Sequence, residues 1–253
     1  MKEEKIPSLT EKIRIFALGG LDEDGKNLFC VEVDQSIYVI EAGIKFPDNK
    51  ESLGIEFIIQ DFTYLVENKD RVAAIFITHG HDDVMGALPY LLKQVPCDVY
   101  TAPLAVKEVQ KKIRQEHISG VRVHSVKRNE KKRIGKRRIV FFPITHAYPG
   151  TFGLAIQTDQ GYIVYSGEFI EDYDDLEDAY RADFTTISEI GNEGVLALLQ
   201  ESKGAERSGH TSPNHRIAPK LLQVLETHEH KRVFVSVYNQ SVYRIQEIID
   251  CCM

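Results

Sequence analysis

Short apolar runs rich in β-branched residues recur along this chain, separated by polar and turn-forming residues. Runs of this length and composition are typical of β-strands that are buried on one or both faces. The sequence therefore predicts strands at residues 13–18, 29–33, 37–40, 72–77, 139–142, 154–158, 162–165 and 195–199. Early hairpins followed by mixed strands and helices indicate a layered α/β (α+β) domain.

Apolar positions recur with a helical period in three further segments, 103–117, 213–227 and 241–253. Between the last two, residues 233–237 have the pattern of a buried strand. One more strand–helix unit therefore starts near the end of the chain, with an apolar helix face that nothing later in the sequence covers. We expect a fragment or a truncated gene product. A docked terminal helix is the alternative.

Composition excludes several classes of protein. Of 253 residues, 43% are hydrophobic and 27% are charged, and the net charge of −7 argues against a small, uniformly basic nucleic-acid binder. The four cysteines show no metal or redox spacing, which fits a reducing cytoplasm. Residues 1–12 are polar, so we expect a flexible N-terminus rather than a targeting peptide. The apolar runs are too short to cross a membrane, and we expect a cytoplasmic protein.

Charge is strongly segregated along the chain. Residues 107–138 carry seven Lys and six Arg against three Glu, whereas residues 168–189 carry nine acids against one Arg. Charge runs of this kind are usually solvated faces. The basic run would also suit a polyanion, because Lys and Arg release condensed counterions when they bind phosphates.

A loop that follows the predicted strand 72–77 holds two histidines and two carboxylates, His79, His81, Asp82 and Asp83. Imidazole nitrogens with a nearby carboxylate suit zinc or a similar divalent metal. A lone His-X-His pattern is weak, because a hydrogen-bonded surface turn can hold one by chance.

Two more predicted strands end in residues of the same kind. Strand 139–142 runs into His146, and strand 162–165 runs into Glu168. Taken alone, His146 could be a hydrogen-bonded loop histidine, and Glu168 could be an exposed acid. Together with His79 and His81, they form a candidate set of metal ligands.

These motifs, taken in order, resemble the RNase J family, in the β-CASP branch of the metallo-β-lactamase superfamily. The match is collinear from about residue 13 to residue 250. It is carried by Ala17-Leu18-Gly19-Gly20, Gly25-Lys26-Asn27, Glu41-Ala42-Gly43, Leu53-Gly54-Ile55, residues 64–68 and 78–92, Thr145-His146, Ser166-Gly167-Glu168-Phe169 and Ala205-Glu206-Arg207.

The resemblance implies a four-layer αββα sandwich over residues 13–206, followed by an incomplete β-CASP domain over 207–253. It also implies RNA as the substrate and hydrolysis of its phosphodiester bonds by a metal-bound hydroxide, as a 5′ exonuclease and an endonuclease. Carried over by position, His79, His81 and His146 would hold one metal. Asp83 would belong to a second metal, and Glu168 would bridge both, so these two carboxylates are the expected catalytic residues.

The departures from the family pattern bear on activity. The family's metal loop reads His-X-His-X-Asp-His, and the last position here is Val84, which offers no lone pair. The bridging position is normally Asp rather than Glu168, and the family's Asp-Ala-Gly begins here with Glu41. We therefore expect one zinc ion at most, with manganese or magnesium as alternatives. The pattern resembles the catalytically weak RNase J paralogue that accompanies an active one in some Gram-positive bacteria.

Three functions remain open from the sequence. The first is a ribonuclease with a degraded two-metal site and weak activity. The second is a non-catalytic subunit that binds RNA, an active RNase J paralogue or a second copy of itself. The third is a hydrolase of small esters or thioesters, which ranks last because the resemblance to RNase J continues past Ala205.

Overall fold

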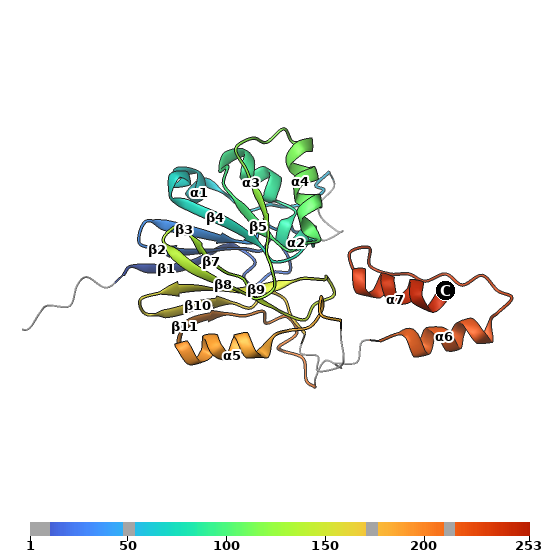
Figure 1. Cartoon of the computed structure of the whole chain (residues 1–253). Coiled ribbons are helices and arrows are strands. Elements are labelled where there is room, and N and C mark those ends of the chain that lie inside the picture. Colours follow the sequence, from blue (N-terminus) through green and yellow to red (C-terminus); the bar gives the residue numbers. More distant parts are fainter. Residues whose placement is uncertain (1–10, 48–53, 171–176, 210–215) are drawn as a thin grey trace, which may run out of the picture.

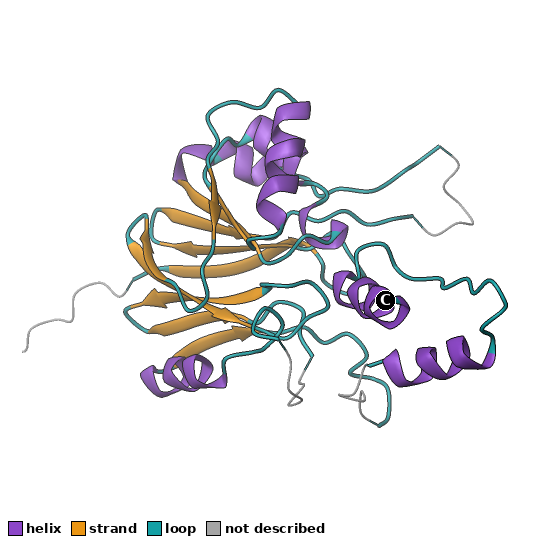
Figure 2. Ribbon diagram, turned by 45° about the vertical axis from the view of Figure 1, so that its right-hand side comes forward, coloured by secondary structure: helices purple, strands orange, loops and turns teal. Residues whose placement is uncertain are grey.

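The computed structural model describes residues 11–47, 54–170, 177–209 and 216–253. Two β-sheets face each other, helices cover the outer face of each sheet, and two further helices lie to one side (Figures 1 and 2). This arrangement confirms the predicted four-layer αββα sandwich. Most of the N-terminal segment that we expect to be flexible, residues 1–10, lies outside the described residues.

The first sheet begins as an antiparallel meander of three strands and continues with three parallel strands. In spatial order its strands are β1 (Ile13–Gly19), β2 (Leu28–Val33), β3 (Ser36–Ile40), β4 (Val72–Ile77), β5 (Val99–Thr101) and β6 (Val123–Ser125). The helices on its outer face are α1 (Thr63–Glu67), α2 (Asp82–Met85), α3 (Leu88–Gln94) and α4 (Ala105–Gln115), and a short 3₁₀ turn, Lys69–Arg71, precedes β4.

The second sheet is antiparallel except at one edge, where its last two strands run parallel. In spatial order its strands are β11 (Val195–Leu199), β10 (Gly161–Tyr165), β9 (Phe152–Thr158), β8 (Arg137–Pro143) and β7 (Lys131–Ile134). Helix α5 (Phe184–Glu193) covers its outer face through Ile187 and Ile190. The Asp183 side chain caps this helix by accepting hydrogen bonds from two backbone N–H groups of its first turn.

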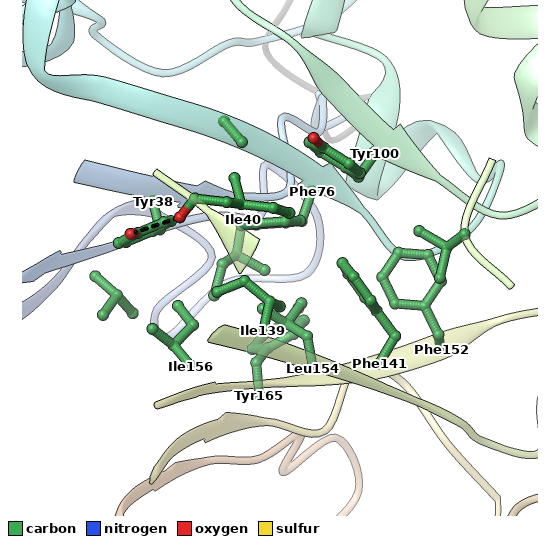
Figure 3. Packing of buried hydrophobic residues seen from close by; sticks show 14 of the residues in the cluster. Tyr38, Ile40, Phe76, Tyr100, Ile139, Phe141, Phe152, Leu154, Ile156 and Tyr165 are labelled. Atoms are coloured by element: carbon green, nitrogen blue, oxygen red, sulfur yellow. Dashed lines mark hydrogen bonds between the residues drawn. The ribbon is translucent and has the colours of Figure 1, made fainter. Parts of the chain in front are cut away.

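Alternation along each central strand explains the four layers. On β3, Tyr38 and Ile40 point into the core between the sheets, whereas Ile37 and Val39 point toward the helices. Strands β4, β8 and β10 divide their side chains in the same way. Figure 3 shows the inner core, where the Tyr38 hydroxyl also donates a hydrogen bond to the Ile134 carbonyl at 3.0 Å. Strands buried on both faces read as continuous apolar runs, which is why the sequence reveals them.

The C-terminal part forms two helices, α6 (Ala218–Thr227) and α7 (Val242–Cys252), at the positions that periodicity predicts. Residues 213–215 of the first predicted helix lie outside the described residues. The predicted buried strand at 233–237 is wrong: this stretch has no regular structure, and Phe234 is 85% exposed. A strand needs a neighbouring edge to pair its backbone groups, and none of the described strands lies beside this stretch.

Helix α4 begins at Ala105, two residues after the predicted start at residue 103, and Pro103 lies in the turn before it. The short strands β5, β6 and β7 and the helix α5 have no prediction of their own, because they are brief or only weakly periodic. Among the described residues, no helix combines the length and the apolar character that a membrane span requires.

Candidate metal centre

Strand directions bring the candidate ligands to one edge of the sandwich. Strands β3 and β4 are parallel, so Glu41 and His79 follow them at the same edge of the first sheet. In the second sheet β8, β10 and β11 all run in one direction, and His146, Glu168 and Glu201 follow their ends. Loops at the ends of strands can therefore aim side chains from both sheets at one point.

Four of the sequence-predicted residues do meet. His79, His81, His146 and Glu168 each offer one ligand atom, and these atoms all lie within 4.8 Å of one another. The ring centroids of the three histidines are 4.4 to 5.1 Å apart, and His146 Nε2 lies 3.7 Å from a Glu168 carboxyl oxygen. Three imidazoles and one carboxylate match the donor set that zinc takes in proteins.

The His79 ring is held by a chain of hydrogen bonds from the core. Thr78 Oγ1 donates to the Glu41 carboxyl at 2.6 Å and lies 2.9 Å from His79 Nδ1. When Nδ1 carries the proton, the lone pair of the ring is on Nε2. That Nε2 atom is buried and has no hydrogen-bond partner, which is costly in an apolar interior and fits a metal ligand.

Burial favours the neutral form of the histidines. Burial, and then the neighbouring His146 and His81, lower the pKa of His79 well below its usual value. Burial, and then His81, lower the pKa of His146 to about 3. Neutral imidazole is the form that binds a metal ion.

The carboxylates crowd together on the other side of the cluster. The pKa of Glu168 is raised to about 9 by burial first, and then by Asp83, Glu201 and Glu41. Asp83 thus lies beside Glu168 but is not one of the four residues whose ligand atoms converge. Like charges placed this closely favour a cation between them or a retained proton.

The position of the missing family histidine is closed and apolar. Val84, in α2, is 1% exposed. The backbone before it packs tightly on Gly43, where an added Cβ would lie 1.5 Å from the Asp83 carbonyl oxygen. The Asn27 N–H also donates to that oxygen at 3.1 Å. The loop geometry is therefore fixed by backbone contacts, and within this loop Val84 is the residue that departs from the family pattern.

Sequence reasoning assigned no contact in this site to four residues that the structure places there: Thr78, Glu41, Glu201 and Gln240. Thr78 and Glu41 lie within the quoted motifs, but only a structure shows that they form the link to His79. Glu201 follows a predicted strand, as Glu168 does, and that signal could have found it. Gln240, whose carbonyl oxygen lies 3.1 Å from His81 Nε2, is 159 residues away in sequence, and no local pattern points to it.

The fold and this site define a class of protein. The family model described as "Beta-lactamase superfamily domain" matches residues 47–233. The chain belongs to the β-lactamase superfamily.

Within that superfamily the chain is similar to ribonucleases J, which confirms the resemblance seen in the sequence. It is 36% identical over 246 residues to Ribonuclease J 2 of Staphylococcus epidermidis, covering 97% of this chain and 44% of the relative. It is 34% identical over 243 residues to Ribonuclease J 1 of Streptococcus pyogenes serotype M3, covering 96% of this chain and 43% of the relative. The chain thus spans less than half the length of these relatives.

One solved structure with a similar fold is that of a protein of unknown function from Enterococcus faecalis V583. It matches with a TM-score of 0.63 at 15% sequence identity, over 95% of this chain and 63% of the other. At this identity the match concerns the fold alone.

Proposed function

We propose that this protein is a metal-dependent ribonuclease of RNA processing and decay with weak activity. The observation that carries the proposal is the converging cluster of His79, His81, His146 and Glu168. The similarity to ribonucleases J supports RNA as the substrate. Residues 207–253 would be the beginning of the β-CASP domain that such an enzyme uses to hold RNA.

The three histidines would hold one zinc ion, with manganese or magnesium as alternatives, and Glu168 would complete the set. Such an ion supplies a water molecule of lowered pKa and stabilises charge on the phosphate. The protein's own groups orient the donors, since the Thr78 hydroxyl links His79 to Glu41. Glu168 would bind the ion as a carboxylate, and its proton would leave when the ion binds. Asp83 lies beside Glu168 and would be the second catalytic carboxylate.

Val84 limits this activity. Its isopropyl group has no donor atom, so a second ion beside Asp83 lacks a ligand. Weak cleavage with a single ion is the consequence that we propose.

The basic run of the sequence supplies a surface for the RNA backbone. Lys107, Lys111 and Arg114 are exposed on α4. This helix lies near the histidine loop, since the Asp82 charge contributes, after burial, to raising the pKa of Glu108. Exposed cations beside the cluster would attract phosphates and release their counterions.

A non-catalytic subunit is the second candidate. The buried, apolar Val84 favours it, because a binding partner of an active ribonuclease J needs no second metal. Such a subunit would bind RNA or the active paralogue and would contribute surface rather than chemistry.

The proposal is tested by elemental analysis of bound metal together with cleavage of 5′-monophosphorylated RNA. We expect about one equivalent of zinc per chain, and we expect His79→Ala to lose both the metal and the cleavage. His117→Ala is the matched control, because His117 is exposed and lies outside the cluster. Metal without cleavage would favour the non-catalytic subunit, and a folded protein that takes up no metal would contradict the proposed site.

A further inference from the structure

The short segment Tyr238–Tyr243, which leads into α7, lies directly against the cluster of His79, His81, His146 and Glu168. The Gln240 carbonyl oxygen is 3.1 Å from His81 Nε2. The Val242 N–H donates to the same oxygen at 3.0 Å, so a tight turn fixes this carbonyl in place. The Tyr238 ring lies edge-on to the His81 ring, with their centroids 6.4 Å apart.

The same segment contacts both histidine-bearing loops. The Gln240 amide nitrogen donates to Asp82 Oδ2 at 2.9 Å, one residue after His81. The Tyr243 N–H donates to the Ala147 carbonyl at 3.2 Å, one residue after His146. One segment therefore joins a loop of the first sheet to a loop of the second sheet beside the cluster.

These contacts determine which nitrogen of His81 is available. A carbonyl oxygen only accepts, so the contact at Nε2 requires the proton to be on Nε2. The lone pair of the ring is then on Nδ1. Metal-ligating histidines characteristically donate their other N–H to a backbone carbonyl or a carboxylate, which sets the tautomer and the ring orientation.

Packing alone does not account for a glutamine at this position. The Gln240 Oε1 atom is buried and has no hydrogen-bond partner among the described residues. An unpaired buried amide oxygen destabilises the folded chain. A leucine would fill similar space without that cost, so the retained amide indicates a role for its donor, which is bonded to Asp82.

We propose that Gln240 is a positioning residue of the metal centre, which holds His81 ready to bind the metal through Nδ1. The inference rests on the proposed metal site. The backbone carbonyl sets the His81 tautomer, and the side-chain amide fastens the segment to the loop through Asp82.

The first test compares Gln240→Leu with Gln246→Leu in the full chain. Gln246 is exposed on α7 and its side-chain amide donates to Asp250 Oδ1 on the same helix, so it is a matched control. Zinc affinity is measured by competition with a chelator. We expect Gln240→Leu to weaken zinc binding about tenfold or more, the usual range for an outer partner of a metal ligand. We expect Gln246→Leu to bind zinc as the unmodified protein does.

A second pair of variants addresses the backbone contact to the other loop. Tyr243→Pro removes the N–H that bonds to Ala147, at a position in the first turn of α7 where proline is tolerated. Tyr243→Ala keeps that N–H and removes only the ring. We expect Tyr243→Pro to lose more zinc affinity than Tyr243→Ala.

Nitrogen-15 NMR of the metal-free protein supplies a readout that is independent of metal and activity. We expect His81 to carry its proton on Nε2, and we expect Gln240→Leu to reduce the population of that tautomer. A His81 proton on Nδ1 would overturn the inference, as would equal zinc affinity in Gln240→Leu and the unmodified protein. If the unmodified protein binds no zinc, the proposed metal site is contradicted. If it binds zinc and Gln240→Leu binds zinc equally well, the role of Gln240 alone is contradicted.

Discussion

Glu41 is a buried acid with an unfavourable backbone conformation. It is fully buried at the end of β3, its backbone has a positive φ of 65°, and burial is the main cause that raises its pKa to about 8. Non-glycine residues in the left-handed region are uncommon and cluster at functional sites. An ionised Glu41 accepts from the Thr78 hydroxyl, whose oxygen can in turn accept from His79 Nδ1. A cation bound by His79 would favour that ionised form.

The raised pKa of Glu41 has a consequence for stability. From its ordinary value of 4.5 up to about 8, the folded chain holds a proton that the unfolded chain has released. The free energy of unfolding therefore falls as pH rises through this range, by up to about 1.4 kcal/mol per pH unit. We expect Glu41→Gln to reduce this slope in urea unfolding of the metal-free protein between pH 5 and 9. Glu67→Gln, at an exposed position, should keep it. An unchanged slope in Glu41→Gln would show that Glu41 titrates normally.

Val84 offers a test of what the site lacks. Replacing it by histidine adds a donor next to Asp83, so we expect Val84→His to bind more metal than the unmodified protein in elemental analysis. Val84→Ala is the control, because it disturbs the same buried position without adding a donor. No gain in bound metal would mean that the site lacks more than this one ligand.

At the scale of elements, the site is formed by the ends of strands and by the loops that follow them. The loop after β4 passes so close to Gly43 that no side chain fits there, and α2 begins within this loop. Glycine is thus required for the close approach of two backbones. The positions of His79 and His81 depend on this contact as much as on their own hydrogen bonds.

We expect Gly43→Ala to displace the loop and to lower the free energy of unfolding by several kcal/mol, about 3 or more, because its Cβ would overlap the Asp83 carbonyl. Bound metal should fall with it. Gly191→Ala, inside α5 where an added Cβ meets nothing within 4 Å, should instead raise stability by up to about 1 kcal/mol. Thermal unfolding and metal analysis of both variants check this. A stable, metal-binding Gly43→Ala protein would contradict it.

The sequence predicted the central strands because burial on two faces leaves an uninterrupted apolar run, as at 72–77. It failed at 233–237, where a similar run has no neighbouring edge to pair with. In the site, local motifs pointed to the candidate ligands at strand ends. The Gln240 contact could not be predicted, because it depends on how α7 docks, and docking depends on packing between parts far apart in sequence.

Across the whole molecule, apolar side chains are buried in the sandwich but exposed in one C-terminal stretch. The sandwich keeps its large side chains in three buried clusters. The stretch between α6 and α7 instead exposes several apolar side chains close together: Phe234, Val235, Val237 and Tyr238. Exposed apolar groups of this kind are typical of surfaces that bind another protein or another copy.

We expect the chain to self-associate, with a sedimentation coefficient that rises with protein concentration. Phe234→Lys should reduce this association, because it places a charge where the ring is 85% exposed. Leu21→Lys is the control, since Leu21 is 67% exposed but lies apart from this stretch in sequence. A single monomeric species at every concentration would contradict the prediction.

The contact between His81 and Gln240 also bears on the order in which the site forms during synthesis of the chain. A ribosome makes the chain from its N-terminus, so all four cluster residues have been synthesised well before Gln240 leaves the exit tunnel. A nascent chain can therefore pack its two sheets together and bring the histidines into one cluster before Gln240 contacts His81. Gln240 follows His81 by 159 residues, so we expect an interval during translation in which an ion reaches the histidines before this segment packs against them.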